Sequence, residues 1–247
     1  VLVQSVYESY KNNPKQFVDR INSYGLNKPL GLPIKGEGKP YVPQPGTNGW
    51  SGTALPWMAF GYGLSVTPLQ TLTLYNAVAN DGVMVKPIFV SEIKEWNKTI
   101  KKYNTEVINP KICSQETLDK VQAVLENVVK RGTGSKLYSK DFSMAGKTGT
   151  AQVNYKDKSK LYYASSFVGY FPADEPKYSC IVVVHKPNVA AGYYGADVAG
   201  PVFKRIAQKI FTDSPSTNHV KNIDAKVVSQ EKNYAEYYKK VEKESNV

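Results

Sequence analysis

Residues 144–152 read Met-Ala-Gly-Lys-Thr-Gly-Thr-Ala-Gln and place a cation, two hydroxyls and a glycine side by side. Lys147 carries a positive charge that can bind a carboxylate or change the proton affinity of a neighbouring group. In an extended chain the hydroxyls of Thr148 and Thr150 point to one face, whereas Gly149 points to the other and lets a ligand come close. The stretch therefore predicts an anion-binding strand edge that could present a backbone N–H to a developing oxyanion. The simpler alternative is an ordinary strand end.

The residues after this stretch have the pattern of antiparallel strands. Strands are expected over residues 162–171 and 177–184, with a proline-bounded turn between them. Together with the Lys147 strand they predict a three-stranded meander. Residues 181–184 read Ile-Val-Val-Val, which favours a central strand covered on both faces. One more strand is expected earlier in the chain, over residues 83–93.

Five stretches carry helix signals, which are apolar residues at helical spacing and, in several cases, a capping residue followed by proline. Helices are expected over residues 1–10, from Asn13 to Gly25, from Thr67 to Asn80, from Ser114 to Gly132, and from Pro201 to residue 212. In the last helix we expect Val202, Ile206 and Ile210 to pack inward. Helices against an antiparallel sheet define an α+β fold. The proline- and glycine-rich residues 26–51 predict an ordered, irregular loop near a site.

Three stretches resemble a known family in the same order along the chain. Residues 146–152 look like the K-T-G motif of the penicillin-binding proteins. Residues 61–70 (Gly-Tyr-Gly-Leu-Ser-Val-Thr-Pro-Leu-Gln) and Tyr193-Tyr194-Gly195 are similar to the class B members, the transpeptidases that cross-link bacterial peptidoglycan. The resemblance covers roughly residues 1–212. It implies the penicillin-binding-protein transpeptidase (serine β-lactamase-like) fold, of which this chain would hold the C-terminal portion.

The same resemblance implies roles for the residues of the strand. Lys147 would support the proton network of the catalytic serines, and the backbone N–H of Thr150 would form half of an oxyanion hole. These two are the expected catalytic residues. Thr148 and Thr150 would bind the terminal carboxylate of the substrate, with Gly149 between them in the substrate-binding strand.

Tyrosines are expected beside this strand, again by resemblance. Tyr62, Tyr193 and Tyr194 match positions at which the family lines its cleft with aromatic side chains, and packing in the hydrophobic core is the alternative. The implied substrates are peptidoglycan stem peptides, and the implied inhibitors are β-lactam antibiotics. Other proteins of cell-wall synthesis or cell division are the implied protein partners.

The nucleophile motif of the family, Ser-x-x-Lys, and its Ser-x-Asn motif are not found in their usual places. Ser91–Lys94 lies in an expected strand, whereas the family's serine opens a helix. Ser229–Lys232 and Ser216–Asn218 follow the Lys147 strand, although the family's motifs precede it. We interpret all three as chance matches, and we expect the working motifs upstream of Val1 in a parent protein.

The predicted organisation follows from these matches. Residues 1–212 form the C-terminal portion of a transpeptidase domain, and residues 213–247 form a charged linker or tail. The expected function is part of a serine-type peptidoglycan D,D-transpeptidase, and this chain alone is expected to be inactive. The alternatives are a non-catalytic penicillin-sensing or binding fragment, and a β-lactamase, which would need a base that activates water.

Composition limits the possible partners. The formal net charge is +11, and basic residues gather at 94–111 and 156–160, which we expect to be solvated loops. Neither segment interleaves lysines with aromatics as nucleic-acid-binding surfaces do, so no nucleic acid is predicted. Cys113 and Cys180 lack partner histidines at metal-ligand spacing, so neither a metal nor a cofactor is predicted. No apolar run reaches the roughly 20 residues that span a bilayer. The parent is expected outside the cytoplasm, held at the membrane by an upstream anchor.

Overall fold

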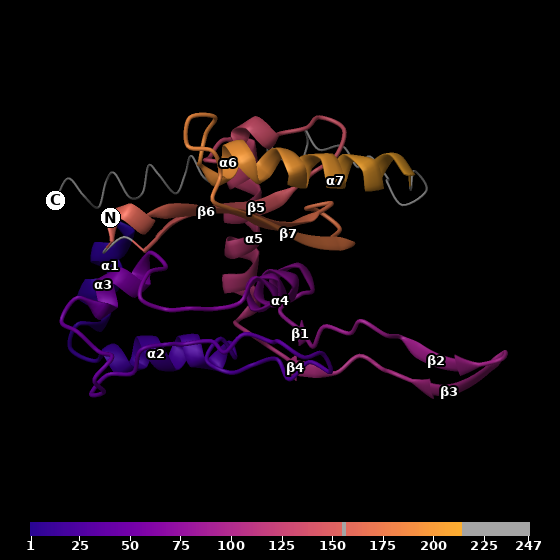
Figure 1. Cartoon of the computed structure of the whole chain (residues 1–247), viewed down its shortest axis with the longest axis horizontal. Coiled ribbons are helices and arrows are strands. Elements are labelled where there is room, and N and C mark those ends of the chain that lie inside the picture. The colour runs from indigo at the N-terminus through magenta and orange to yellow at the C-terminus, as the bar shows by residue number, and fades with distance from the viewer. Residues whose placement is uncertain (155–156, 214–247) are drawn as a thin grey trace.

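The computed structural model describes residues 1–154 and 157–213. At its centre is a three-stranded antiparallel sheet with the strand order β5-β6-β7 (Figure 1). The strands are β5 (Ala145–Val153), β6 (Tyr162–Phe171) and β7 (Tyr178–His185), and the short helix η2 (Lys158–Lys160) lies between the first two. The predicted meander and the predicted α+β class are therefore confirmed.

The central position in the sheet belongs to β6, so the expectation that residues 181–184 form a central strand is wrong. These residues lie in β7, at the edge of the sheet. Two helices contact β7, namely α4 (Pro68–Ala79) and α7 (Gly200–Asp213), and they cover opposite faces of the sheet (Figure 1). An edge strand that is covered on both faces has the same continuous apolar sequence as a central strand. The apolar pattern shows that both faces of a strand are buried, but it does not show whether one or two neighbouring strands pair with it.

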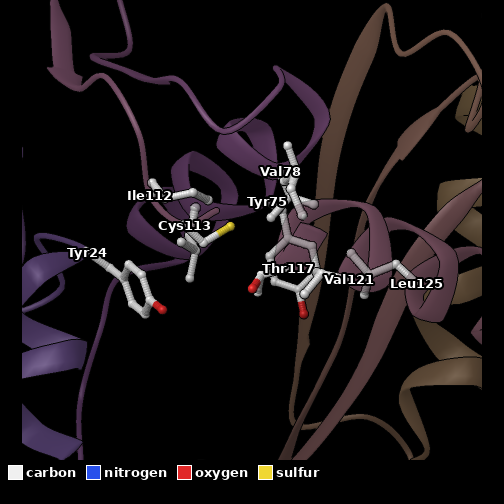
Figure 2. Close-up of a pocket in the computed structure, with 10 residues that line it drawn as sticks. Tyr24, Tyr75, Val78, Ile112, Cys113, Thr117, Val121 and Leu125 are labelled. Atoms are coloured by element: carbon white, nitrogen blue, oxygen red, sulfur yellow. The ribbon is translucent and has the colours of Figure 1, made fainter. Parts of the chain in front are cut away.

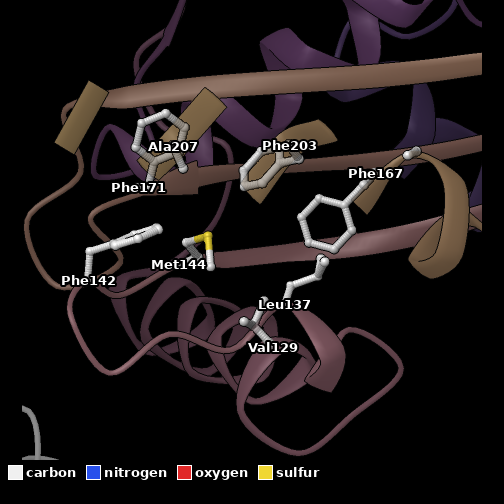
Figure 3. Packing of buried hydrophobic residues seen from close by; sticks show 9 residues of the cluster. Val129, Leu137, Phe142, Met144, Phe167, Phe171, Phe203 and Ala207 are labelled. Carbon is white, nitrogen blue, oxygen red and sulfur yellow. The ribbon is translucent and has the colours of Figure 1, made fainter. Parts of the chain in front are cut away.

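One face of the sheet packs against α7 and the short helices η1 (Ser135–Leu137) and α6 (Gly195–Val198). Figure 3 shows the resulting cluster, in which Phe167 of β6 meets Phe203 of α7 with ring centroids 4.7 Å apart. Leu137 belongs to the same cluster and is almost completely buried. This cluster fixes the helices on the face of the sheet that carries Phe167.

The inward face of α7 differs from the prediction. Val202 and Ile206 are exposed, while Phe203 and Ala207 are fully buried and Ile210 is partly buried. A phenylalanine ring buries more apolar area than valine or isoleucine. The helix therefore presents the stripe that contains Phe203, and the adjacent aliphatic stripe faces outward.

The opposite face of the sheet packs against α4 and α5 (Gln115–Lys130). The predicted start of α4 is confirmed: the Thr67 hydroxyl accepts from Gln70 N–H at 3.1 Å, and the Gln70 side chain accepts from Thr67 N–H at 2.9 Å. The predicted start of α5 is also confirmed, since Ser114 Oγ accepts from Thr117 N–H at 3.3 Å. Both helix starts are fixed by hydrogen bonds that are local in sequence.

The first part of the chain forms the helices α1 (Leu2–Tyr10), α2 (Pro14–Ser23) and α3 (Ala54–Ala59). Asn13 precedes α2, as expected, but makes no side-chain capping bond. Residues 26–51 form the predicted irregular loop. Helix α3 was not predicted, because its six residues are too few for a helical period to be recognised.

Two small antiparallel pairs lie between α4 and α5. They are β1 (Met84–Val85) with β4 (Val107–Asn109), and β2 (Glu92–Glu95) with β3 (Lys98–Lys102). The expected single strand over 83–93 is wrong, since Pro87, which has no N–H for a strand ladder, lies in the break between β1 and β2. The basic segment 94–111 is also not simply a loop, because β3 and β4 lie within it.

The predicted tail falls, apart from Asp213 at the end of α7, outside the described residues. The same holds for the matches Ser216–Asn218 and Ser229–Lys232. Within residues 1–154 and 157–213, no helix combines the length and the apolar character that crossing a bilayer requires.

Candidate active site

Strand β5 has an edge that no other described strand pairs with. At this edge the backbone N–H of Gln152 donates to the Tyr62 hydroxyl at 2.8 Å. In an antiparallel strand the N–H and C=O of alternate residues point to the same edge. The N–H groups of Thr150 and Thr148, two and four residues earlier, therefore face the open edge as well.

Lys147 lies at this edge with its charge only partly hydrated. Its Nζ donates to the backbone oxygen of Thr148 at 2.9 Å and to Thr148 Oγ1 at 3.3 Å. Burial lowers the pKa of Lys147, and no carboxylate of the described chain acts on that pKa in the opposite direction. A partly desolvated ammonium group without an anionic partner is able to bind an anionic ligand.

The two threonines share a face of β5, as predicted. Thr148 pairs in register with Phe167 and Thr150 with Ser165, two residues apart on β6. Thr150 Oγ1 accepts from the Gly195 N–H at 3.0 Å. A hydroxyl that accepts one hydrogen bond still has its own proton to donate. Thr150 is therefore oriented by the protein and can still donate a hydrogen bond to a ligand.

Thr133 is a site residue that the sequence did not reveal. Its Oγ1 lies 3.0 Å from Thr148 Oγ1, so Lys147, Thr148 and Thr133 form a continuous polar chain. Thr133 stands between Gly132 and Gly134, directly after the helix that was predicted to end at Gly132. A Cβ on Gly132 would lie 2.8 Å from the Val128 backbone, so the turn is packed tightly on the end of α5. A hydroxyl between two glycines, at the end of a predicted helix, was the available signal.

The segment that carries Tyr193 and Tyr194 is attached to the same face of the sheet. Ser165 Oγ donates to the Tyr193 backbone oxygen, and Gly195 follows directly with its bond to Thr150. A side chain on Gly195 would overlap the backbone oxygens of Ser166 and Gly149. Glycine is therefore required at position 195, because any Cβ would push this segment away from β5.

Three tyrosines form a stack beside β5. The rings of Tyr163 and Tyr193 have centroids 4.2 Å apart, and those of Tyr193 and Tyr194 lie 4.4 Å apart. Tyr193 Oη donates to Tyr194 Oη at 3.1 Å, and this bond, together with the nearby phenols, raises the pKa of Tyr193 to about 12. Tyr194 is 55% exposed, so the alternative that it packs in the core is wrong. Tyr163 was missed because nothing in its local sequence separates it from the other aromatics of β6.

Tyr62 approaches β5 from the other side of the site. It belongs to an aromatic group in which its ring lies 5.6 Å from Trp57 and 5.4 Å from Phe60, measured between centroids. Trp57 is in α3, directly after the loop that we expected near a site. Through its bond to Gln152, Tyr62 places this aromatic group at the end of the open edge.

A separate apolar cavity of about 230 Å³ lies among α4, α5 and the end of α2 (Figure 2). Tyr24, Tyr75 and Cys113 are among its lining residues, and none of these residues comes from β5. The cysteines Cys113 and Cys180 are both free. No group of three potential metal ligands is found in the described part of the chain. The cavity and the polar edge of β5 are therefore different places.

The serine matches can also be located. Lys94 lies in β2 and its Nζ binds Glu92 at 2.6 Å, while Ser91 stands just before the strand. The prediction that Ser91–Lys94 is associated with a strand and not with the start of a helix is confirmed. Lys94 Nζ is held by Glu92 and makes no described hydrogen bond to the Ser91 hydroxyl, so the structure does not place this lysine to activate this serine.

The structure therefore combines an α+β fold with a Lys-Thr-Gly strand whose outer edge no described strand covers. Residues 3–208 match the family model described as the penicillin binding protein transpeptidase domain. The chain belongs to this family, as the sequence motifs predicted.

Individual relatives agree with this assignment. The chain is 30% identical over 197 residues to the peptidoglycan D,D-transpeptidase FtsI of Buchnera aphidicola, covering 79% of this chain and 33% of that protein. It is 33% identical over 193 residues to the stage V sporulation protein D of Bacillus subtilis, covering 75% of this chain and 29% of that protein. The chain thus spans about a third of the length of the curated relatives that it matches.

Solved structures give the same result for the fold. Penicillin binding protein 3 from Mycobacterium tuberculosis, without ligand, matches with a TM-score of 0.71 and 29% identity, over 82% of this chain and 47% of that one. The same protein complexed with aztreonam matches with a TM-score of 0.70 and 29% identity, over 82% of this chain and 47% of that one. The predicted transpeptidase fold is therefore confirmed.

Proposed function

We propose that this chain forms the Lys-Thr-Gly side of the active site of a peptidoglycan D,D-transpeptidase, which cross-links stem peptides through a serine acyl-enzyme and is acylated by β-lactams. The observation that carries the proposal is the open edge of β5, where a partly desolvated Lys147 without a carboxylate partner lies beside two oriented threonine hydroxyls. The names of the relatives and the aztreonam complex support it.

In this proposal each group of the edge has its own task. Lys147, whose pKa is lowered by burial, holds or passes a proton near the reacting serine and attracts the carboxylate of the incoming peptide. The hydroxyls of Thr148 and Thr150 donate hydrogen bonds to that carboxylate. The Thr150 N–H faces the open edge and stabilises the oxyanion of the tetrahedral intermediate. The stack of Tyr163, Tyr193 and Tyr194 bounds the space in which the substrate lies.

We infer further that the acylated serine is supplied by sequence outside these residues, since Lys94 is held by Glu92 and makes no described hydrogen bond to Ser91. The intact protein would then work outside the cytoplasm, where stem peptides are cross-linked, with other proteins of wall synthesis or cell division as partners. An anchor upstream of this segment would hold it at the membrane.

The proposal is tested on an intact transpeptidase that contains this segment, by following its acylation with a fluorescent penicillin. Lys147→Ala removes charge-assisted hydrogen bonds that are worth about 1.5–3 kcal/mol each, so we expect the acylation rate to fall on the order of tenfold or more. Lys120→Ala removes an exposed cation on α5 and is the matched control, with an unchanged rate expected. A Lys147→Ala rate within twofold of wild type would exclude Lys147 from the reaction.

A further inference from the structure

The strands β2 and β3 form a two-stranded ribbon that extends away from the rest of the molecule (Figure 1). Glu95 pairs with Lys98, which leaves Trp96 and Asn97 as the two residues of the turn at its tip. Trp96 is 95% exposed there. The ribbon therefore presents a complete indole side chain to the surroundings at the point farthest from its stem.

The backbone of the tip is unfavourable for the residue that it carries. Trp96 has a φ of 53°, in the left-handed region that Gly and Asn adopt readily in such turns. For other residues this conformation is strained, because the Cβ comes too close to the following carbonyl oxygen. In the free chain Trp96 is thus unfavourable in two ways, because its backbone is strained and its apolar ring is exposed to water. Strained residues of this kind occur where a ligand or partner is bound.

The rest of the ribbon combines cations with apolar side chains. Its lysines are Lys94, Lys98, Lys101 and Lys102, and its acids are Glu92 and Glu95, so its net charge is four minus two, or +2. Glu92 is already held by Lys94 at 2.6 Å and by the Thr99 hydroxyl at 3.1 Å. Ile93 and Ile100 are exposed, and so are residues 88–90 (Ile-Phe-Val) at the stem.

These features argue against a third strand as the partner. Lysines on both strands and the register shift between Ile93 and Lys94 are devices that prevent the edges of a sheet from pairing with another strand. The exposed apolar side chains lie at the tip, on both strands and at the stem, so they are distributed along the whole length of the ribbon. A partner without a fixed shape, and with negative charge, fits this distribution best.

We propose that the ribbon is a peripheral membrane contact, in which Trp96 enters the headgroup region of an anionic phospholipid bilayer and the lysines bind the lipid phosphates. An indole suits this region because its ring is apolar and its N–H can remain hydrogen-bonded. Lysine side chains cover apolar surface with their methylene groups and keep the ammonium at the headgroups. The net charge of +11 on the chain adds long-range attraction. This contact would be independent of the reaction proposed above.

The test measures binding of the whole chain to vesicles by sedimentation, comparing pure phosphatidylcholine with an equimolar mixture of phosphatidylcholine and phosphatidylglycerol. We expect binding to the mixture alone. Each lysine near the surface contributes a factor of about five in affinity, so K98Q/K101Q/K102Q should weaken binding on the order of a hundredfold. K120Q/K140Q/K209Q removes the same charge from exposed sites elsewhere and should weaken it far less.

Trp96→Asn gives the decisive comparison, because asparagine tolerates the left-handed backbone of the turn. We expect this variant to lose binding while its melting temperature stays the same or rises. Wild type that fails to bind the anionic vesicles would overturn the proposal. It would also be overturned if Trp96→Asn binds as wild type does, or if the two lysine triples weaken binding equally, since binding would then reflect net charge alone.

Discussion

At the scale of single residues, the open edge of β5 carries two threonine hydroxyls, each of which accepts a hydrogen bond from the protein. Thr150 Oγ1 accepts from Gly195 N–H, and Thr148 Oγ1 accepts from Lys147 Nζ. The Thr150 hydroxyl keeps its proton available, whereas the Thr148 hydroxyl shares a further hydrogen bond with Thr133 in which either oxygen can be the donor. Lys147, Thr148 and Thr150 could be picked out from the sequence because they lie within four consecutive residues of one strand. Thr133 could not, because its position beside Thr148 depends on how the end of α5 packs.

Lys147 should destabilise the chain through its charge. A lysine whose pKa is lowered in the folded state imposes a penalty that is fully present below the folded pKa and disappears as pH rises through the ordinary lysine value near 10.4. We expect the stability of wild type relative to Lys147→Met to increase between pH 7 and pH 11, measured by urea unfolding at each pH.

Lys209 supplies a control of opposite sign. A hydrogen bond to Asp213 raises the pKa of Lys209, so the stability that it contributes is present below the ordinary lysine pKa and is lost as pH rises through the raised value. Wild type should therefore lose stability relative to Lys209→Met over the same pH range. A flat difference between wild type and Lys147→Met would show that burial does not penalise the Lys147 charge.

At the scale of elements, the two helix starts that the sequence predicted to the residue are those set by neighbours in the chain. Helices α4 and α5 begin at Thr67 and Ser114 because local side-chain to backbone bonds fix these starts. The ribbon of β2 and β3 was missed because its pairing is interrupted by a register shift, and its side chains do not alternate between apolar and polar. The face that α7 buries depends on the space beside Phe167, which no local pattern describes.

The attachment of residues 193–195 to β5 is the element-scale feature that shapes the site. Gly195→Ala would place a methyl group against the backbone oxygens of Ser166 and Gly149, which cannot rotate away. We expect a loss of about 1–3 kcal/mol of folding free energy. For a chain of this size that lowers the melting temperature by roughly 2–10 °C, measured by calorimetry.

Gly52→Ala is the matched control for this substitution, because a Cβ at Gly52 has no other atom within 4 Å. It should leave the melting temperature within about a degree of wild type, since it creates no overlap. If the two substitutions have equal effects, the close approach of Gly195 to β5 does not hold this segment in place.

At the scale of the whole molecule, the sheet has an open polar edge, and the two serines of β6 that lie opposite it are not bonded to a lysine in the described part of the chain. Ser165, opposite Thr150 on β6, is fully buried and donates its hydroxyl to the Tyr193 backbone oxygen. Ser166 lies under Gly149, where its Oγ would be 2.5 Å from a Cβ at that position. Neither serine has a lysine bonded to its hydroxyl among the described contacts.

We therefore predict that residues 1–247 alone do not react covalently with penicillin, even when they are folded as the structure describes. Acyl transfer needs a serine whose proton is taken by a neighbouring base, and without it the covalent intermediate cannot form, whatever the state of the oxyanion donors. Incubation with a fluorescent penicillin followed by intact mass spectrometry should give the unmodified mass, whereas an intact transpeptidase of the same family, treated in parallel, gives an adduct. A stoichiometric adduct on Ser91, Ser166 or any other serine of this chain would show that it contains its own nucleophile and would contradict the roles proposed here for the β5 edge.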